Sequence, residues 1–156
     1  MKEQETKRPR VAVPPPLIFG IPFVVGLGLQ WVYPLRFPSL WVGLTLGVLC
    51  ILPSLTLLVS ARLAFRRSRN SMRYTSRSRV LILQGPFRYT RNPLFLGLLL
   101  LYAGTCFAVC MPWPLLFLPL VVALLHWVVI LPEERFLEDR FGGEYRLYKL
   151  RVRRWI

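Results

Sequence analysis

The chain has very few acidic residues. Only seven of its 156 residues are Asp or Glu, against 21 Lys and Arg, and no carboxylate occurs between Glu5 and Glu133. The one histidine, His126, and the three cysteines lie in apolar runs, and the cysteines have no CxxC spacing. We therefore find no nucleophile triad, metal-binding cluster, disulfide framework or phosphate loop, and a lone histidine in such a run is more often packed than a ligand. Any catalysis must rest on positioning and on a reactive cofactor.

Long apolar runs dominate what is present. Hydrophobic residues make up 54% of the chain, and the charged residues form blocks between these runs. Such segregation is typical of membrane proteins. The formal charge of +14 would suggest nucleic acid binding in a soluble chain, but here the basic residues border the hydrophobic spans. We therefore expect anionic lipid headgroups or an anionic ligand as partners, and no nucleic acid.

Four apolar runs approach the length of about 20 helical residues that crosses a bilayer core. They cover residues 17–33, 39–61, 93–109 and 111–131. The link between the last two is so short that they must form an antiparallel hairpin. The first run does not resemble a cleaved signal peptide, because it is long, is followed by a second run and lacks a small-residue cleavage site. The sequence predicts an all-α, polytopic membrane protein with four transmembrane helices.

We expect a single membrane-embedded domain with five parts. These are a basic tail (1–13), two spans (14–61), an Arg-rich loop (62–92), a helical hairpin (93–131) and a C-terminal segment (132–156). The C-terminal segment alternates basic with apolar residues, as an amphipathic helix on a membrane surface does, and breaks at Gly142-Gly143. All Lys and Arg residues except Arg36 lie in the tail, the loop and the C-terminal segment. The positive-inside rule therefore predicts that both termini and the loop are cytoplasmic.

The stretch Gly85–Gly97 leads from the Arg-rich loop into the third apolar run. It contains a turn signal, two arginines and three aromatic residues, at Phe87, Tyr89 and Phe95. Two interpretations remain open for it. An aromatic and basic collar is a common interfacial anchor at the start of a transmembrane helix. The same side chains also suit a binding site at the water boundary.

A polar cluster is expected where the outer ends of the hairpin meet. The third run begins at Arg91-Asn92-Pro93, and the fourth ends before Glu133-Glu134. Both ends of a hairpin lie at the same membrane face, so these residues should be neighbours. Half-buried charge at such a depth is costly and is usually functional. The structural alternative is a salt bridge from Arg91 to one of the two glutamates that pins the hairpin.

Three sequence blocks resemble a known group of enzymes. They are GPFRYTRNPLFLG (Gly85–Gly97), EER (Glu133–Arg135) and FGGEYRLY (Phe141–Tyr148). They are similar to the pattern of the isoprenylcysteine carboxyl methyltransferase and phospholipid methyltransferase families, which is G-[PV]-Y, R-[HN]-P-x-Y-x-G, a Glu pair and F-G-x-E-Y-x-x-Y. The resemblance covers residues 79–154. It implies an integral-membrane methyltransferase that uses S-adenosylmethionine and a lipophilic acceptor from the bilayer, such as an isoprenylcysteine carboxylate or a phospholipid.

The resemblance also implies site residues. Its catalytic positions fall on Arg91 and Glu134. Its cofactor-binding positions fall on Arg79, Val80, Leu81, Ile82, Phe87, Asn92, Pro93, Leu94, Phe95 and Glu133. No metal is implied.

The chain departs from the family pattern in ways that keep other interpretations open. Asn92 replaces a histidine, as in many bacterial relatives, which points to a bacterial inner membrane. Phe87 and Phe95 replace tyrosines, and Val129 stands where the isoprenylcysteine enzymes carry a substrate arginine. The alternatives are an NADPH-dependent sterol-type membrane reductase and a non-catalytic relative that keeps the fold. The sequence predicts no oligomeric state.

Overall fold

The computed structural model describes residues 13–72 and 83–155, and these residues contain helices and connecting segments but no strand. The elements are α1 (Pro15–Val32), α2 (Leu40–Met72), the 3₁₀ turn η1 (Gly85–Arg88), α3 (Pro93–Ala108), α4 (Pro112–Leu116), α5 (Leu118–Leu124), the π-helical segment η2 (Leu125–Ile130), α6 (Leu131–Phe141) and α7 (Gly143–Arg151). This confirms the all-α prediction for the described part of the chain.

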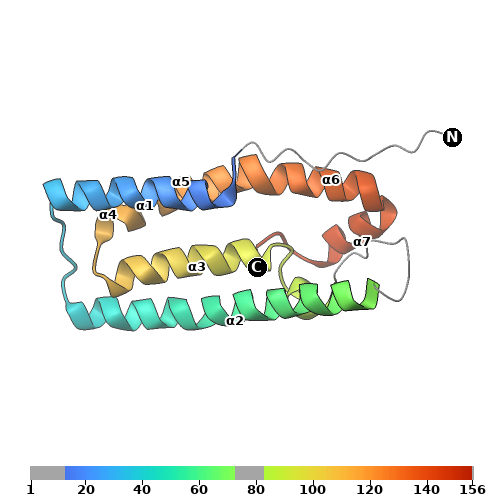
Figure 1. Cartoon of the computed structure of the whole chain (residues 1–156), viewed down its shortest axis with the longest axis horizontal. Coiled ribbons are helices and arrows are strands. Elements are labelled where there is room, and N and C mark those ends of the chain that lie inside the picture. The colour runs from blue at the N-terminus through green and yellow to red at the C-terminus, as the bar shows by residue number, and fades with distance from the viewer. Residues whose placement is uncertain (1–12, 73–82, 156) are drawn as a thin grey trace.

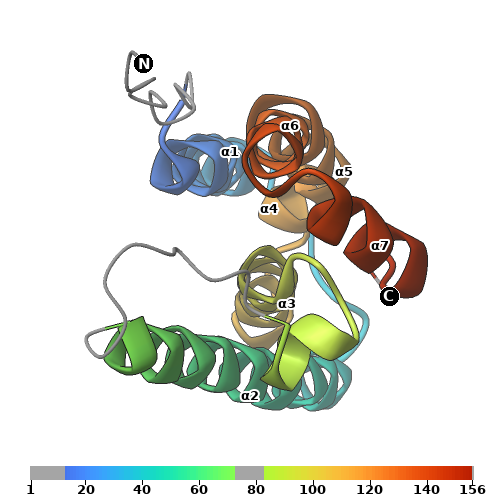
Figure 2. The ribbon, with the colours of Figure 1, turned by 90° about the vertical axis from the view of Figure 1, so that its right-hand side faces the viewer.

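The helices form an elongated bundle, with α3 between two outer layers (Figure 1). One layer is α2, which packs along α3. The other consists of α1 and of the column formed by α4, α5, η2 and α6, and α1 packs against α4. Figure 2 shows α7 leaving the end of α6 at the edge of the bundle. The C-terminus then returns to the start of α3.

Two helices are long and apolar enough to cross a membrane. They are α1 and the part of α2 from Leu40 to Ser68. Helix α3 is also apolar but has 16 residues, which corresponds to about 24 Å of rise. The two long helices support a membrane protein, while the third and fourth predicted spans remain predictions.

The helix boundaries differ from the prediction in two places. Helix α2 continues past Ala61 to Met72, so the predicted loop over 62–92 begins as helix. No Gly or Pro occurs between Ala61 and Met72, so nothing in the sequence stops the helix where the apolar run ends. The fourth run, predicted as one helix over 111–131, is divided at Phe117 and by η2. The nearby Pro119 and Pro132 lack the N–H that a continuous helix would use.

A seam of small residues brings α2 and α3 into close contact. Its glycines are Gly43 and Gly47 on α2 and Gly97 and Gly104 on α3. A Cβ atom on Gly47 would lie 2.9 Å from the Cβ of Ala108. The buried Ser54 hydroxyl donates to the Gly97 carbonyl at 2.8 Å. Small residues allow backbones in lipid to approach in this way, and the contact fixes the position at which α3 begins.

The second contact holds α3 to the column and to the C-terminal tail. Tyr102 of α3 donates its hydroxyl to the carbonyl of Pro114 at 2.7 Å. Around it lies a buried apolar cluster that consists of Ile18, Leu99, Tyr102, Cys106, Val121, Leu125 and Val129. Trp155 packs against this cluster from the tail. The hairpin and the tail are therefore held in one packed unit.

The glycine seam leads to a prediction about stability. Gly104→Ala would place a Cβ 2.7 Å from Ile51 Cγ1 and 3.1 Å from the Gly47 carbonyl oxygen, so the helices must separate. We expect the free energy of unfolding to fall by about 1–3 kcal/mol, measured as a lower thermal midpoint in detergent. The matched control is Gly20→Ala, because nothing lies within 4 Å of that position. Equal midpoints for the two variants would contradict the close α2–α3 packing.

Candidate functional site

The turn before α3 is held by contacts to two other helices. Gly85 adopts φ +64°, a backbone conformation that favours glycine, and Pro86 is buried. The ring of Phe87 meets the ring of Phe65 on α2 edge to face, with centroids 5.5 Å apart. The Phe87 carbonyl accepts a hydrogen bond from the Tyr148 hydroxyl of α7 at 2.7 Å. The GPF motif therefore forms a rigid turn between α2 and α7.

The C-terminal tail is hydrogen-bonded to the start of α3. The Arg91 backbone N–H donates to the Arg153 carbonyl at 3.0 Å. The Arg154 carbonyl accepts from the Thr90 hydroxyl at 3.1 Å and from the Asn92 side-chain amide at 3.2 Å. These three bonds involve the consecutive residues Thr90, Arg91 and Asn92, so the tail packs directly on the beginning of the third apolar run.

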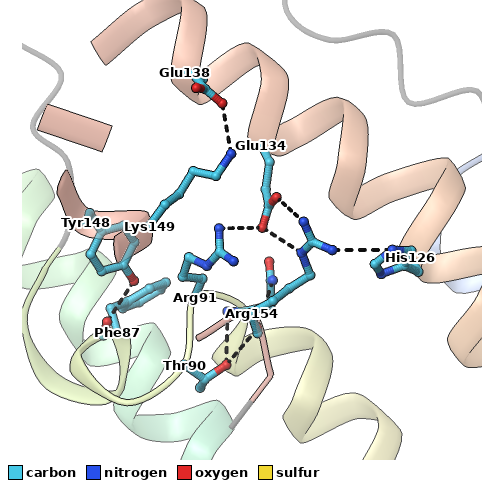
Figure 3. A network of polar contacts seen from close by, with 10 residues as sticks. Phe87, Thr90, Arg91, His126, Glu134, Glu138, Tyr148, Lys149 and Arg154 are labelled. Carbon is cyan, nitrogen blue, oxygen red and sulfur yellow. Dashed lines mark hydrogen bonds and ion pairs between the residues drawn. The ribbon is translucent and has the colours of Figure 1, made fainter. Parts of the chain in front are cut away.

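Glu134 lies between two arginines (Figure 3). Arg154 binds it with two hydrogen bonds, from Nε to Oε1 at 3.0 Å and from Nη2 to Oε2 at 2.8 Å. Arg91 Nη1 lies 3.0 Å from the same Oε1. Glu134 is only 5% exposed, so its charge needs such partners. The prediction that the outer ends of the hairpin meet is confirmed, and Glu134 is the glutamate that pairs with Arg91.

Arg91 has two buried donors that make no hydrogen bond. Its side chain is 10% exposed, and its Nε and Nη1 atoms are buried without a hydrogen-bond partner in the described chain. Nη1 is within ion-pair distance of Glu134, but the angle lies outside hydrogen-bond geometry. Buried donors are rarely left unpaired. These donors could therefore bind an anionic group.

The second glutamate of the pair occupies a different environment. Glu133 is half-buried, and within residues 13–72 and 83–155 no cation lies at ion-pair distance from it. Burial, and then the charge of Glu134, raise the pKa of Glu133 above its usual range. Burial also raises the pKa of Tyr145 to about 12, with Glu134 adding to the shift and Arg91 opposing it. The site is thus poorly solvated, which strengthens electrostatic interactions within it.

The remaining predicted residues are distributed around this cluster. Phe87 lies in η1, Asn92 precedes α3, and Pro93 and Leu94 form its first turn. Phe95 packs against the apolar cluster that Trp155 also contacts. Arg79, Val80, Leu81 and Ile82 lie outside the described residues.

Sequence reasoning missed Arg154. It also did not anticipate that the Arg154 Nη1 lies 3.4 Å from His126 Nε2, a contact whose donor and acceptor depend on the histidine tautomer. His126 lies in η2, and π-helical turns often occur at functional sites. The C-terminal segment contains many basic residues, most of which precede an apolar residue as Arg154 does, so no signal in the sequence distinguishes Arg154.

The ion pairs of Glu134 lead to a second prediction. Glu134→Gln leaves the buried Arg91 without a counter-charge and also removes the carboxylate that binds Arg154. We expect a loss of about 3–5 kcal/mol in the free energy of unfolding, measured by denaturation in detergent. Glu138→Gln is the control, because Glu138 pairs with Arg146 and Lys149 at the surface and should matter little. Similar losses in both variants would show that the buried ion pairs of Glu134 stabilise the protein no more than the surface ion pairs of Glu138.

Comparisons with known proteins agree with this arrangement. A family model described as phospholipid methyltransferase matches residues 42–144, well over half of the chain. An uncharacterized protein of Haemophilus influenzae is 46% identical over 35 residues, which cover 22% of this chain and 56% of that protein. The chain thus spans about half the length of that relative, and no solved structure matches. By the extent of the family match, the chain belongs to the phospholipid methyltransferase family.

Proposed function

We propose that the protein is an integral-membrane methyltransferase that moves a methyl group from S-adenosylmethionine to a lipophilic acceptor. The family supports methyl transfer at a membrane, and the two long apolar helices agree with it. The observation that carries the cofactor assignment is the pair of buried donors of Arg91 that have no hydrogen-bond partner, beside the Glu133-Glu134 pair.

The charged groups of the site fit the amino-acid part of this cofactor. That part bears one carboxylate and one ammonium group. Arg91 has two buried donors without a hydrogen-bond partner, Nε and Nη1, and its Nε–H would donate a charge-assisted hydrogen bond to the carboxylate. Glu133 has no paired cation in the described chain, and its carboxylate would hold the ammonium group. Phe87 and Phe95 would offer aromatic surface to the adenine.

The protein contributes alignment and a dry environment. When bound, S-adenosylmethionine supplies a methyl group on a positively charged sulfur, which a nucleophilic acceptor displaces. Glu134 holds the guanidinium of Arg91 in place and is itself held by Arg154. The poor solvation of the cluster favours reactions in which charge is neutralised. We therefore propose that Arg91 contacts the cofactor, and that Glu134, expected at a catalytic position, acts mainly by positioning Arg91.

The acceptor is proposed to enter from the bilayer. The site lies where the apolar helix α3 begins, and Trp127, one residue after His126, is exposed at the outside of η2. A lipophilic molecule could therefore reach the site without leaving the membrane. We further propose a cytoplasmic location for the site and both termini, as the positive-inside rule predicts, in a bacterial inner membrane.

One observation favours the non-catalytic alternative. Both oxygens of Glu134 are already engaged by arginines, as they would be in a salt bridge that only pins the hairpin. The two interpretations differ in what they say about Arg91. A purely structural pair has no use for the unpaired Nε and Nη1 atoms, whereas a binding site needs them.

Titration with S-adenosylhomocysteine separates these interpretations. Arg91→Ala and Glu133→Ala should each weaken binding by about 1–3 kcal/mol in calorimetry of the detergent-purified protein, because each removes a charge-assisted hydrogen bond. Arg88→Ala is the control, since Arg88 is an exposed arginine in the same turn. Unchanged affinity in both site variants would reject the assignment. Binding of NADPH instead of the nucleoside would favour the reductase.

The raised pKa of Glu133 predicts a pH dependence of binding. Only the ionised carboxylate pairs with an ammonium group, and burial keeps Glu133 protonated to a higher pH than an ordinary glutamate. Affinity for S-adenosylhomocysteine should therefore rise with pH through the range above the usual glutamate value of about 4.3. Glu133→Gln should flatten this rise. An unchanged pH profile in that variant would show that Glu133 does not bind the ammonium group.

A further inference from the structure

Helix α7 has apolar residues on two opposite faces. Its inner face carries Tyr145 and Tyr148, which are buried together with Val152 just beyond the helix. Its outer face carries Leu147, which is 57% exposed, and Leu150, which is 84% exposed. The spacing of three residues places both leucines on one side of the helix. Packing among the residues that the structure describes does not explain an outer face of this kind.

Arginines flank the two leucines. On a helical projection Arg146 lies to one side of them and Arg151 to the other, and both are exposed. Arg153 is exposed in the tail that follows. The nearby acids balance only part of this charge, because Glu138 pairs with Arg146, whose side chain stays 72% exposed, whereas Arg151 and Arg153 form no ion pair within the described residues. The outer face is therefore apolar at its centre and cationic at its edges.

Helix α7 lies beyond the start of the apolar helix α3 along the bundle (Figure 1). The chain reverses at Gly142, where φ is +53°, at the end of α6. Helix α7 then returns, and the tail behind it bonds to Thr90 and Asn92. Tyr148 donates to the Phe87 carbonyl and the Arg153 carbonyl accepts from the Arg91 N–H, so the C-terminal half of α7 lies beside the turn that precedes the apolar helix α3.

We propose that the outer face of α7, made up of Leu147, Leu150, Arg146 and Arg151, docks on the anionic lipid headgroups of the surrounding leaflet. The leucines insert at the boundary between headgroups and acyl chains, and the arginines bind lipid phosphates. Apolar insertion combined with basic residues is the combination that gives stable surface attachment. An anionic leaflet fits both parts of this face.

Docking of α7 on lipid would also affect the Glu134 site. The end of α7 leads into the tail that places Arg154 on Glu134. A lipid surface that holds α7 down therefore also holds this ion pair closed, and Glu134 in turn positions Arg91. We infer that anionic lipid strengthens nucleoside binding. This second step rests on the proposed methyltransferase function, whereas the docking itself does not.

Hydrogen exchange of the full-length protein in lipid nanodiscs tests the docking. Amides of residues 143–155 should exchange about tenfold more slowly in discs with one third phosphatidylglycerol than in discs of phosphatidylcholine alone. The variant Leu147→Gln/Leu150→Gln and the variant Arg146→Gln/Arg151→Gln should each lose this difference. The matched control is Leu35→Gln/Arg36→Gln, which changes an exposed leucine and arginine in the turn between α1 and α2.

Three outcomes would overturn the proposal. Exchange of α7 could be the same in both kinds of disc, or the lipid difference could persist in the two α7 variants. Protection could instead follow the number of protein copies in each disc, which would mean that a second copy covers this face. Protection of α6 serves as an internal standard, because a variant that fails to fold would lose it as well.

Titration of the same discs with S-adenosylhomocysteine tests the link to the site. Wild-type affinity should be several-fold higher in the anionic discs, and the α7 variants should show one affinity in both. Equal wild-type affinities with lipid-dependent exchange would reject the link and leave the docking intact. Absence of nucleoside binding in every disc would reject the proposed function, and the exchange result would still decide the docking.

Discussion

The desolvated carboxylate of Glu134 is the constraint on which the rest of the site depends. A buried carboxylate without partners would cost several kcal/mol, so it must be met by cations with good geometry. Those cations come from two distant parts of the chain, Arg91 before α3 and Arg154 in the tail. The α2–α3 seam fixes where Arg91 emerges, and the tail can reach Glu134 only because the chain reverses at Gly142. One side chain thus holds three segments of the chain together.

The charge balance of this cluster distinguishes a binding site from a structural pin. Two buried or half-buried arginines face one fully engaged carboxylate, and Glu133, with its raised pKa, is the only other acid beside them in the described chain. A pin that served stability alone would be expected to satisfy its donors, because each unpaired buried group is costly. Arg91 instead leaves two donors unmet. The cluster is therefore better understood as a binding site for a zwitterionic or anionic ligand.

Much of this arrangement follows from local sequence patterns, and some of it cannot. Run lengths gave the helices, hairpin geometry brought Arg91 to the Glu pair, and the glycines predicted the break at Gly142. The prediction missed the extension of α2 to Met72. An apolar run indicates which residues can lie in lipid, whereas the residues that follow in water can still favour a helix. Spacing could not decide between Glu133 and Glu134, since adjacent helical residues differ by about 100° in direction. Arg154 differs from the other arginines of the tail by its tertiary contact with Glu134, which no local pattern reveals.

The family match and the tail contribute different parts of the site. The matched residues 42–144 include α3, Arg91 and both glutamates, but they end before Tyr145. The parts of the site that the C-terminal segment supplies, which include most of α7 and Arg154, follow that point. The helices therefore provide one arginine and a carboxyl pair, and the last dozen residues provide Arg154, which pairs with Glu134. Since the tail contacts the site through Arg154 and backbone carbonyls, changes in this short segment can alter the charge of the site without repacking any membrane helix.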